Sequence, residues 1–137
     1  MSSNKIEITN TGYKKIDSEH LGLVELIYQI EYQIVGDDDN DNLKASFNLF
    51  FKRVAEHCES EKYVFEETEL PYSVIEKYIK KQQTFLTASR GLFDEANSST
   101  GKERTIKYRD LWNKIEKWVI EQVTVEAAIF QLFKKGN

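Results

Sequence analysis

The spacing of the apolar residues constrains this chain more than any other feature of its sequence. Along most of the 137 residues, apolar side chains recur three and four positions apart, which is the period of an amphipathic α-helix. Only one proline, Pro71, and six glycines interrupt the pattern, and strand signals are weak. We therefore predict an all-α fold. The length fits a single domain, residues 1–137, that is large enough to bury a core.

Short polar turns divide the helical pattern into four segments. We expect helices over about 18–35, 43–68, 73–93 and 103–134. An extended arm, residues 1–15, precedes them, and Asp17 with Glu19 supplies a cap and early negative charge for the first helix. Four helices of comparable length joined by short loops pack most simply as an up-down-up-down bundle.

Composition argues against several classes of partner. The net charge of −4 is mild and both signs are interspersed, which disfavours a nucleic-acid or membrane surface. No apolar run is long enough for a membrane span and no export signal follows Met1, so we expect a cytoplasmic protein. A single cysteine, Cys58, excludes an internal disulfide and fits a reducing compartment. We expect its thiol to be buried and inert.

Polar residues recur on the apolar faces of the predicted helices. His57 and Glu61 are four positions apart and therefore share one helix face, which points into the core. Buried polar groups need hydrogen-bond partners or a metal ion, because an unpaired charge in an apolar interior is costly. The polar residues that we expect inside the bundle are His20, His57, Glu61, Tyr78, Gln82 and Gln122.

Two imidazoles and one carboxylate form a ligand set that suits iron(II) with open coordination positions, or zinc. His20, His57 and Glu61 are the candidate metal ligands. Tyr78 could add a phenolate, and the glutamines could orient a ligand or a bound water. The alternative is a metal-free polar cluster in which Glu61 hydrogen-bonds the imidazoles.

In the fourth helix the apolar seam has heptad-like spacing. The expected inward positions after Trp118 are Gln122, Val125, Ile129 and Leu132.

Several segments resemble the hemerythrins, including the bacteriohemerythrins. Residues 16–23 read IDSEHLGL and resemble the I-D-x-Q-H-x-x-L start of the first hemerythrin helix. Residues 57–61, HCESE, with Phe65 resemble the H-F-x-x-E-E-x-L-M signature of the second helix. Pro71 lies where the family has a Tyr-Pro turn, and residues 118–119 resemble the W-L of the fourth helix. The resemblance implies a hemerythrin-like bundle from about residue 12 to residue 133.

The resemblance also implies an incomplete site. Hemerythrins hold two irons with five histidines and two bridging carboxylates and bind dioxygen, whereas this chain has two histidines. His20, His57 and Glu61 match the ligands of one iron. The ligand pair of the third helix falls on Tyr78 and Gln82 if Phe85 is matched to the family's phenylalanine, or on Glu76 and Lys80 if residues are counted from Pro71 without a gap. The ligands of the fourth helix fall on Gln122 and Ala127. Glu126 is the nearest carboxylate and could be drawn in by a small change in register, but a surface position is the default for a glutamate. Oxygen carriage of the hemerythrin kind needs two electrons from two irons, so we do not expect it.

These observations predict a hemerythrin-like metal-binding protein whose degenerate site holds at most one metal ion. Iron is the first candidate, with dioxygen or nitric oxide as its ligand in a binding or sensing role, and zinc is the second. The alternative is a metal-free bundle that serves as a protein-interaction module. Because no substrate pocket, positioned acid or cofactor motif is apparent, we do not expect an enzyme. A protein partner or a homo-oligomer stays open.

Overall fold

The computed structural model describes residues 5–36 and 40–136. Residues 1–4 of the predicted arm and residues 37–39 of the turn after the first helix lie outside this range. The helical elements are α1 (Lys14–Val35), α2 (Asn40–Phe65), α3 (Tyr72–Asn97), α4 (Gly101–Glu121), a π-helix η1 (Gln122–Glu126) and α5 (Ala127–Leu132). The last three are consecutive in the chain and form one helical rod. No strand is present among the described residues.

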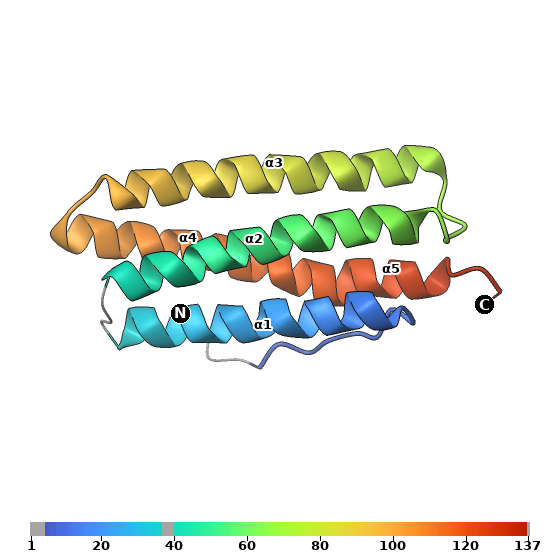
Figure 1. The fold of residues 1–137 in the computed structure, drawn as a ribbon, viewed down its shortest axis with the longest axis horizontal. Helices are drawn as coiled ribbons and strands as arrows, with labels where there is room; N and C mark the ends of the chain where they lie inside the picture. Colours follow the sequence, from blue (N-terminus) through green and yellow to red (C-terminus); the bar gives the residue numbers. More distant parts are fainter. Residues whose placement is uncertain (1–4, 37–39, 137) are drawn as a thin grey trace.

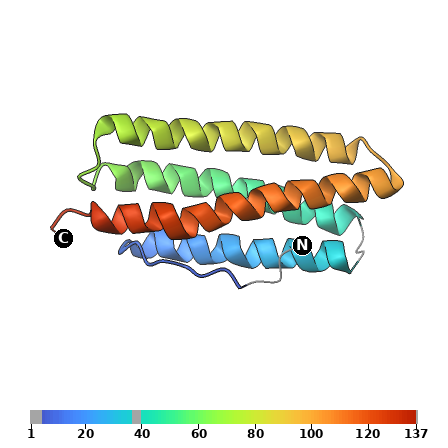
Figure 2. The same cartoon turned by 180° about the vertical axis from the view of Figure 1, so that it is seen from behind.

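The four rods pack side by side in alternating directions (Figures 1 and 2). α1 contacts α2 and α4, and α3 contacts the same two helices from the other side. The predicted all-α, up-down-up-down four-helix bundle is therefore confirmed. None of the helices in the described part of the chain combines the length and the apolar character needed to cross a membrane.

Large aromatic side chains tie the rods together. The ring of Phe47 on α2 lies 5.5 Å from that of Phe93 on α3 and 5.4 Å from that of Tyr108 on α4, measured between centroids. On α4, Trp112 is fully buried, and its indole N–H donates a 2.9 Å hydrogen bond to the carbonyl oxygen of Ile27 on α1. This satisfies the indole nitrogen in an otherwise apolar layer.

α1 begins at Lys14, four residues earlier than predicted, and the role of Asp17 differs accordingly. Asp17 lies within the first turn of the helix and does not cap it. Its Oδ1 accepts hydrogen bonds from the backbone N–H and the hydroxyl of Thr11, both at 2.8 Å. The intervening Gly12 has a φ of +86°, a conformation that favours glycine. Asp17 therefore anchors the arm where it turns into the helix.

The arm reaches the π-helix through one backbone hydrogen bond. In a regular α-helix the carbonyl of Val123 would accept the N–H of Ala127, but that N–H reaches back to Gln122. The freed carbonyl oxygen of Val123 instead accepts a 2.7 Å hydrogen bond from the N–H of Thr9. The arm thus supplies the donor that the π-turn removes.

The π-helix changes the face that the rest of the rod presents to the core. The predicted seam holds through Gln122 and then fails, since Val125 is 57% and Leu132 is 70% exposed. Glu126 and Phe130 are buried in their place. A π-turn inserts one extra residue into the helix and so moves every later side chain to a new register. The heptad-like seam predicted from the sequence assumes a regular α-helix and therefore does not contain this extra residue.

The contact between the arm and the π-helix is testable by removing a single N–H. We expect Thr9→Pro to lower the free energy of unfolding by about 1–3 kcal/mol, because the buried carbonyl of Val123 loses its donor. Chemical denaturation measures the change. Thr9→Ala keeps the backbone N–H and is the matched control. Equal stability of the two variants would contradict the role assigned to this hydrogen bond.

Candidate functional site

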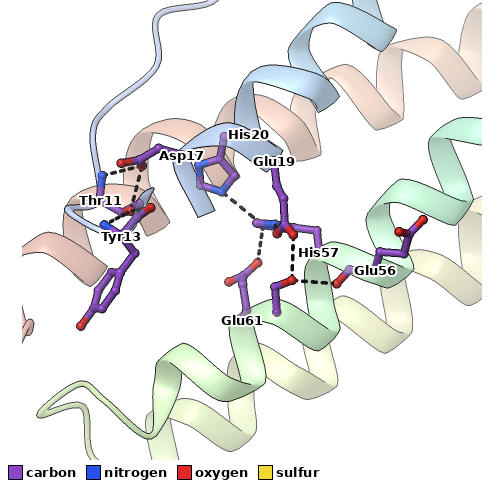
Figure 3. A network of polar contacts seen from close by, with 9 residues as sticks. Thr11, Tyr13, Asp17, Glu19, His20, Glu56, His57 and Glu61 are labelled. Carbon is purple, nitrogen blue, oxygen red and sulfur yellow. Dashed lines mark hydrogen bonds and ion pairs between the residues drawn. The ribbon is translucent and has the colours of Figure 1, made fainter. Parts of the chain in front are cut away.

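His20, His57 and Glu61 meet in the interior of the bundle. His20 projects from α1, while His57 and Glu61 lie one turn apart on α2, and all three are at most 1% exposed. Nε2 of His57 lies 3.2 Å from Nε2 of His20 and 2.6 Å from Oε1 of Glu61 (Figure 3). The structure thus brings the three predicted ligand residues into direct contact inside the core.

A fourth residue, Glu19, belongs to the same cluster and was not among the predicted site residues. Its Oε1 lies 2.7 Å from Nδ1 of His57, and its Oε2 accepts a 2.7 Å hydrogen bond from the hydroxyl of Ser60 (Figure 3). The sequence showed only an acidic residue beside a core histidine near the start of a helix. Consecutive helical residues point about 100° apart, so Glu19 reaches α2 from the edge of the interface.

The electrostatic surroundings of the cluster give the two histidines different pKa values. Burial lowers the pKa of His57, but the carboxylates of Glu61 and Glu19 outweigh it and raise this pKa to about 9. Burial and the neighbouring charge of His57 lower the pKa of His20 to about 3. At neutral pH, without a bound metal ion, His57 is an imidazolium that donates from both ring nitrogens. His20 is neutral and accepts at Nε2.

Glu61 is close to His57 without being a satisfied acceptor. Within the described part of the chain, neither of its oxygens accepts a hydrogen bond of ordinary geometry, because the Nε2–H bond of His57 is directed at His20. Nδ1 of His20 also has no partner there. Oε1 of Glu61 is paired with the His57 imidazolium at 2.6 Å, but Oε2 has no partner among the described residues and could accept a further cation or proton donor.

A second carboxyl group, Glu126, is turned into the core by the π-helix. It is 5% exposed, so the expected surface position is wrong. The side-chain amide of Gln122 donates a hydrogen bond to its Oε2. Burial, together with the charge of Glu61, raises the pKa of Glu126 to about 8. Glu126 is therefore mostly a neutral acid at pH 7.

The other predicted polar residues have separate roles in packing. Gln82 and Gln122 are buried as predicted, whereas Tyr78 is only partly buried and stacks on Phe65 with ring centroids 6.0 Å apart. Among the described residues, none of the three hydrogen-bonds to the histidines or to Glu61. Nε2 of Gln82 and Oε1 of Gln122 have no hydrogen-bond partner there.

In a metal site, the distance between two donor atoms follows from the metal–ligand bond length and the angle between the two bonds. Two nitrogens bound to one ion at about 2.1 Å are about 3.0 Å apart at a right angle and about 3.4 Å apart at a tetrahedral angle. The imidazole nitrogens of His20 and His57 are 3.2 Å apart. Oε1 of Glu61, in contrast, is only 2.6 Å from Nε2 of His57, which is below this range. The residue types and the spacing of the two nitrogens therefore suit a metal ion, whereas the carboxylate would have to move to join them.

The contacts of the cluster nevertheless differ from those of a preformed site. Across residues 5–36 and 40–136, no group of three or more His, Cys, Asp or Glu side chains is arranged to hold a metal ion. The proton on Nε2 of His57 is directed at His20, so these groups contact one another and do not surround a common point. A metal ion would have to replace that proton.

Cys58 lies beside this cluster and takes no part in it. It is 8% exposed, as expected for a buried thiol. Burial, with the charges of Glu61 and Glu126, raises its pKa to about 12. A thiol with such a pKa is protonated at neutral pH and unreactive.

No protein-family model, curated protein or solved structure matches the chain. The resemblance to hemerythrins therefore rests on the sequence motifs alone.

The raised pKa of Glu126 predicts how stability depends on pH. The native state binds this proton more tightly than the unfolded chain does, so its ionisation costs stability from about pH 4.5 upward, and the full cost is reached above pH 8. Glu126→Gln removes that cost. We expect its stability relative to the wild type to increase between pH 5 and pH 9 by an amount on the order of 4 kcal/mol.

Urea unfolding of the metal-free proteins at the two pH values measures this difference. Glu103→Gln is the control, because the Glu103 side chain is 68% exposed on the same rod and pairs with Lys107. A difference between Glu126→Gln and the wild type that stays constant from pH 5 to pH 9 would show that Glu126 is not held as a neutral acid.

Proposed function

We propose that the chain is a hemerythrin-like protein that binds one metal ion through His20, His57 and Glu61. Iron is the first candidate and zinc the second. The observation that carries the proposal is the contact of Nε2 of His57 with both Nε2 of His20 and Oε1 of Glu61 in the core. Further support comes from Oε2 of Glu61, which has no hydrogen-bond partner among the described residues, whereas Oε1 is paired with His57.

The arrangement of the ligands favours one ion over two. His57 and Glu61 are held one turn apart on α2, and His20 approaches from α1. A second ion would need donors from α3 and the last rod, where the buried polar side chains are Gln82, Ser89, Gln122 and Glu126, and none of these is an imidazole. Glu126 is the carboxyl group among them, and its raised pKa of about 8 keeps it mostly protonated at neutral pH. Side-chain amides bind iron and zinc more weakly than imidazole or carboxylate groups do.

A bound iron(II) with three protein ligands would supply open coordination positions for a small ligand such as dioxygen or nitric oxide. The residues of the chain would exclude bulk water from that position, because the three ligand side chains are at most 1% exposed. The neutral carboxyl of Glu126 is a further polar group in the same core and is electrostatically coupled to Glu61. We therefore propose a binding or sensing role and not a catalytic one.

The alternative function is that of a metal-free protein-interaction module. It is favoured by the pairing of His57 with two carboxylates and a second imidazole, which accounts for its charge without a metal ion. Three tyrosines offer surface for contacts with a partner, since Tyr32, Tyr63 and Tyr72 are at least 74% exposed. Metal content distinguishes the two functions.

Elemental analysis of protein expressed with ample iron and zinc, and purified without chelator, tests the proposal. We expect about one metal ion per chain in the wild type and close to none in His57→Ala. Zinc added to the metal-free wild type at 100 times its Kd should also stabilise the fold by about 2.7 kcal/mol.

Two further variants control for loss of the fold. Glu61→Gln keeps the size of the side chain and removes its charge, and it should also lose the metal. Ser89→Ala changes another fully buried polar side chain, on α3, and should keep it. A metal-free wild type would reject the proposal in favour of the interaction module.

A further inference from the structure

Glu19 is held in one orientation by hydrogen bonds to both of its carboxylate oxygens. One oxygen accepts from Nδ1 of His57 and the other from the hydroxyl of Ser60, each at 2.7 Å. Both partners belong to α2, whereas Glu19 belongs to α1, so the carboxylate bridges the two helices. Figure 3 shows Glu19 on the side of the His57 ring away from His20.

This contact determines which nitrogen of His57 is available to a metal ion. A neutral imidazole has one protonated nitrogen and one with a free lone pair, and a hydrogen bond at one nitrogen selects the state of the other. A carboxylate at Nδ1 retains the proton there. Nε2, which faces His20 and Glu61, is then the nitrogen with the lone pair. Histidines that bind metals commonly donate their second N–H to a carboxylate in this way.

We propose that Glu19 is the positioning residue of the site, because it keeps the proton of His57 on Nδ1 and orients the ring so that Nε2 faces the metal position. The inference rests on the proposed metal-binding function. It assigns to Glu19 a role that neither the sequence motifs nor the resemblance to hemerythrins indicated. In those proteins the residue before the first histidine is a glutamine.

The orientation of the Glu19 side chain depends more on its hydrogen bonds than on packing against neighbouring side chains. It borders a groove of about 390 Å³ between α1 and α2, whose walls include Gly22, Glu25 and Glu56. A side chain at Gly22 would meet no atom within 4 Å, so this part of the wall is open. The Glu19 side chain is itself 24% exposed. Ser60 is therefore a second determinant of its orientation.

The two histidines are oriented by different means. His57 has a carboxylate at the nitrogen remote from the site, whereas Nδ1 of His20 has no hydrogen-bond partner among the described residues. Removing Glu19 should therefore change the state of His57 and leave that of His20 as it was. A change at His57 without a change at His20 would therefore distinguish the proposed role of Glu19 from a general loss of stability.

Zinc affinity of the full chain is the first measurement, by competition with a chelator of known Kd. We expect Glu19→Ala to weaken zinc binding by about 10- to 100-fold. Glu19→Gln keeps an acceptor oxygen for His57 and should lose less. Glu25→Gln is the matched control, because Glu25 is an exposed acidic residue of the same helix and groove.

The second measurement is long-range proton–nitrogen NMR of the zinc-loaded proteins. In the wild type and in Glu19→Gln, His57 should show a slowly exchanging Nδ1–H and a coordinated Nε2. In Glu19→Ala the Nδ1–H should exchange rapidly, while the signals of His20 stay unchanged. Loss of fold stability alone would not change one histidine selectively.

The outcomes distinguish failure of the proposed metal binding from failure of the role proposed for Glu19. A wild type that binds no zinc overturns the proposed function and this inference together. A wild type that binds zinc, with Glu19→Ala within twofold of Glu25→Gln and the Nδ1–H retained, overturns the inference alone. If Glu19→Ala does not fold, Ser60→Ala takes its place in the test, because this variant frees one oxygen of Glu19. Weaker zinc binding with faster Nδ1–H exchange supports the proposal, and no change overturns it.

Discussion

The burial of a charged imidazole between two carboxylates is the interaction on which the interior of this bundle depends. His57 is fully buried, yet Glu19 and Glu61 keep its pKa near 9, so in the metal-free protein it carries a charge within the core. Burying a charge is costly unless it is paired, and removal of one partner of a buried pair costs several kcal/mol. The pairing of His57 therefore links α1 to α2, because Glu19 and His20 come from one helix and His57 and Glu61 from the other.

The same cluster accounts for both proposed states of the site. Without a metal ion, a proton on Nε2 of His57 holds the ring against His20 and lies close to Glu61. A metal ion would take the place of this proton and use the same three donor groups, with Glu19 keeping its contact at Nδ1. Metal binding and protonation compete for the ligands of metal sites in general. Here the two imidazole nitrogens already have a suitable spacing, whereas Glu61, 2.6 Å from Nε2 of His57, would have to move to make room for the ion.

The π-helix introduces the other departure from a regular bundle. It places a second carboxyl group, Glu126, in the core, and the neutral state of that group limits the accumulation of negative charge beside Glu61. π-turns are rare, and they occur often at functional sites because they insert a residue that a regular helix would not accommodate. In this protein the turn contacts the arm, whose Thr9 donates to the carbonyl that the π-turn leaves free.

The sequence by itself determined the all-α class, the four helices and the inward direction of His20, His57 and Glu61. Helical periodicity fixes where a side chain points relative to the axis of its own helix, and no long-range information is needed. The contact of Glu19 with His57 was decided by the tertiary structure, because it depends on how α1 and α2 lie against each other. The burial of Glu126 and the exposure of Val125 depend on a register change beside Thr9, more than a hundred residues away in the chain. Local spacing cannot encode a hydrogen bond between such distant segments.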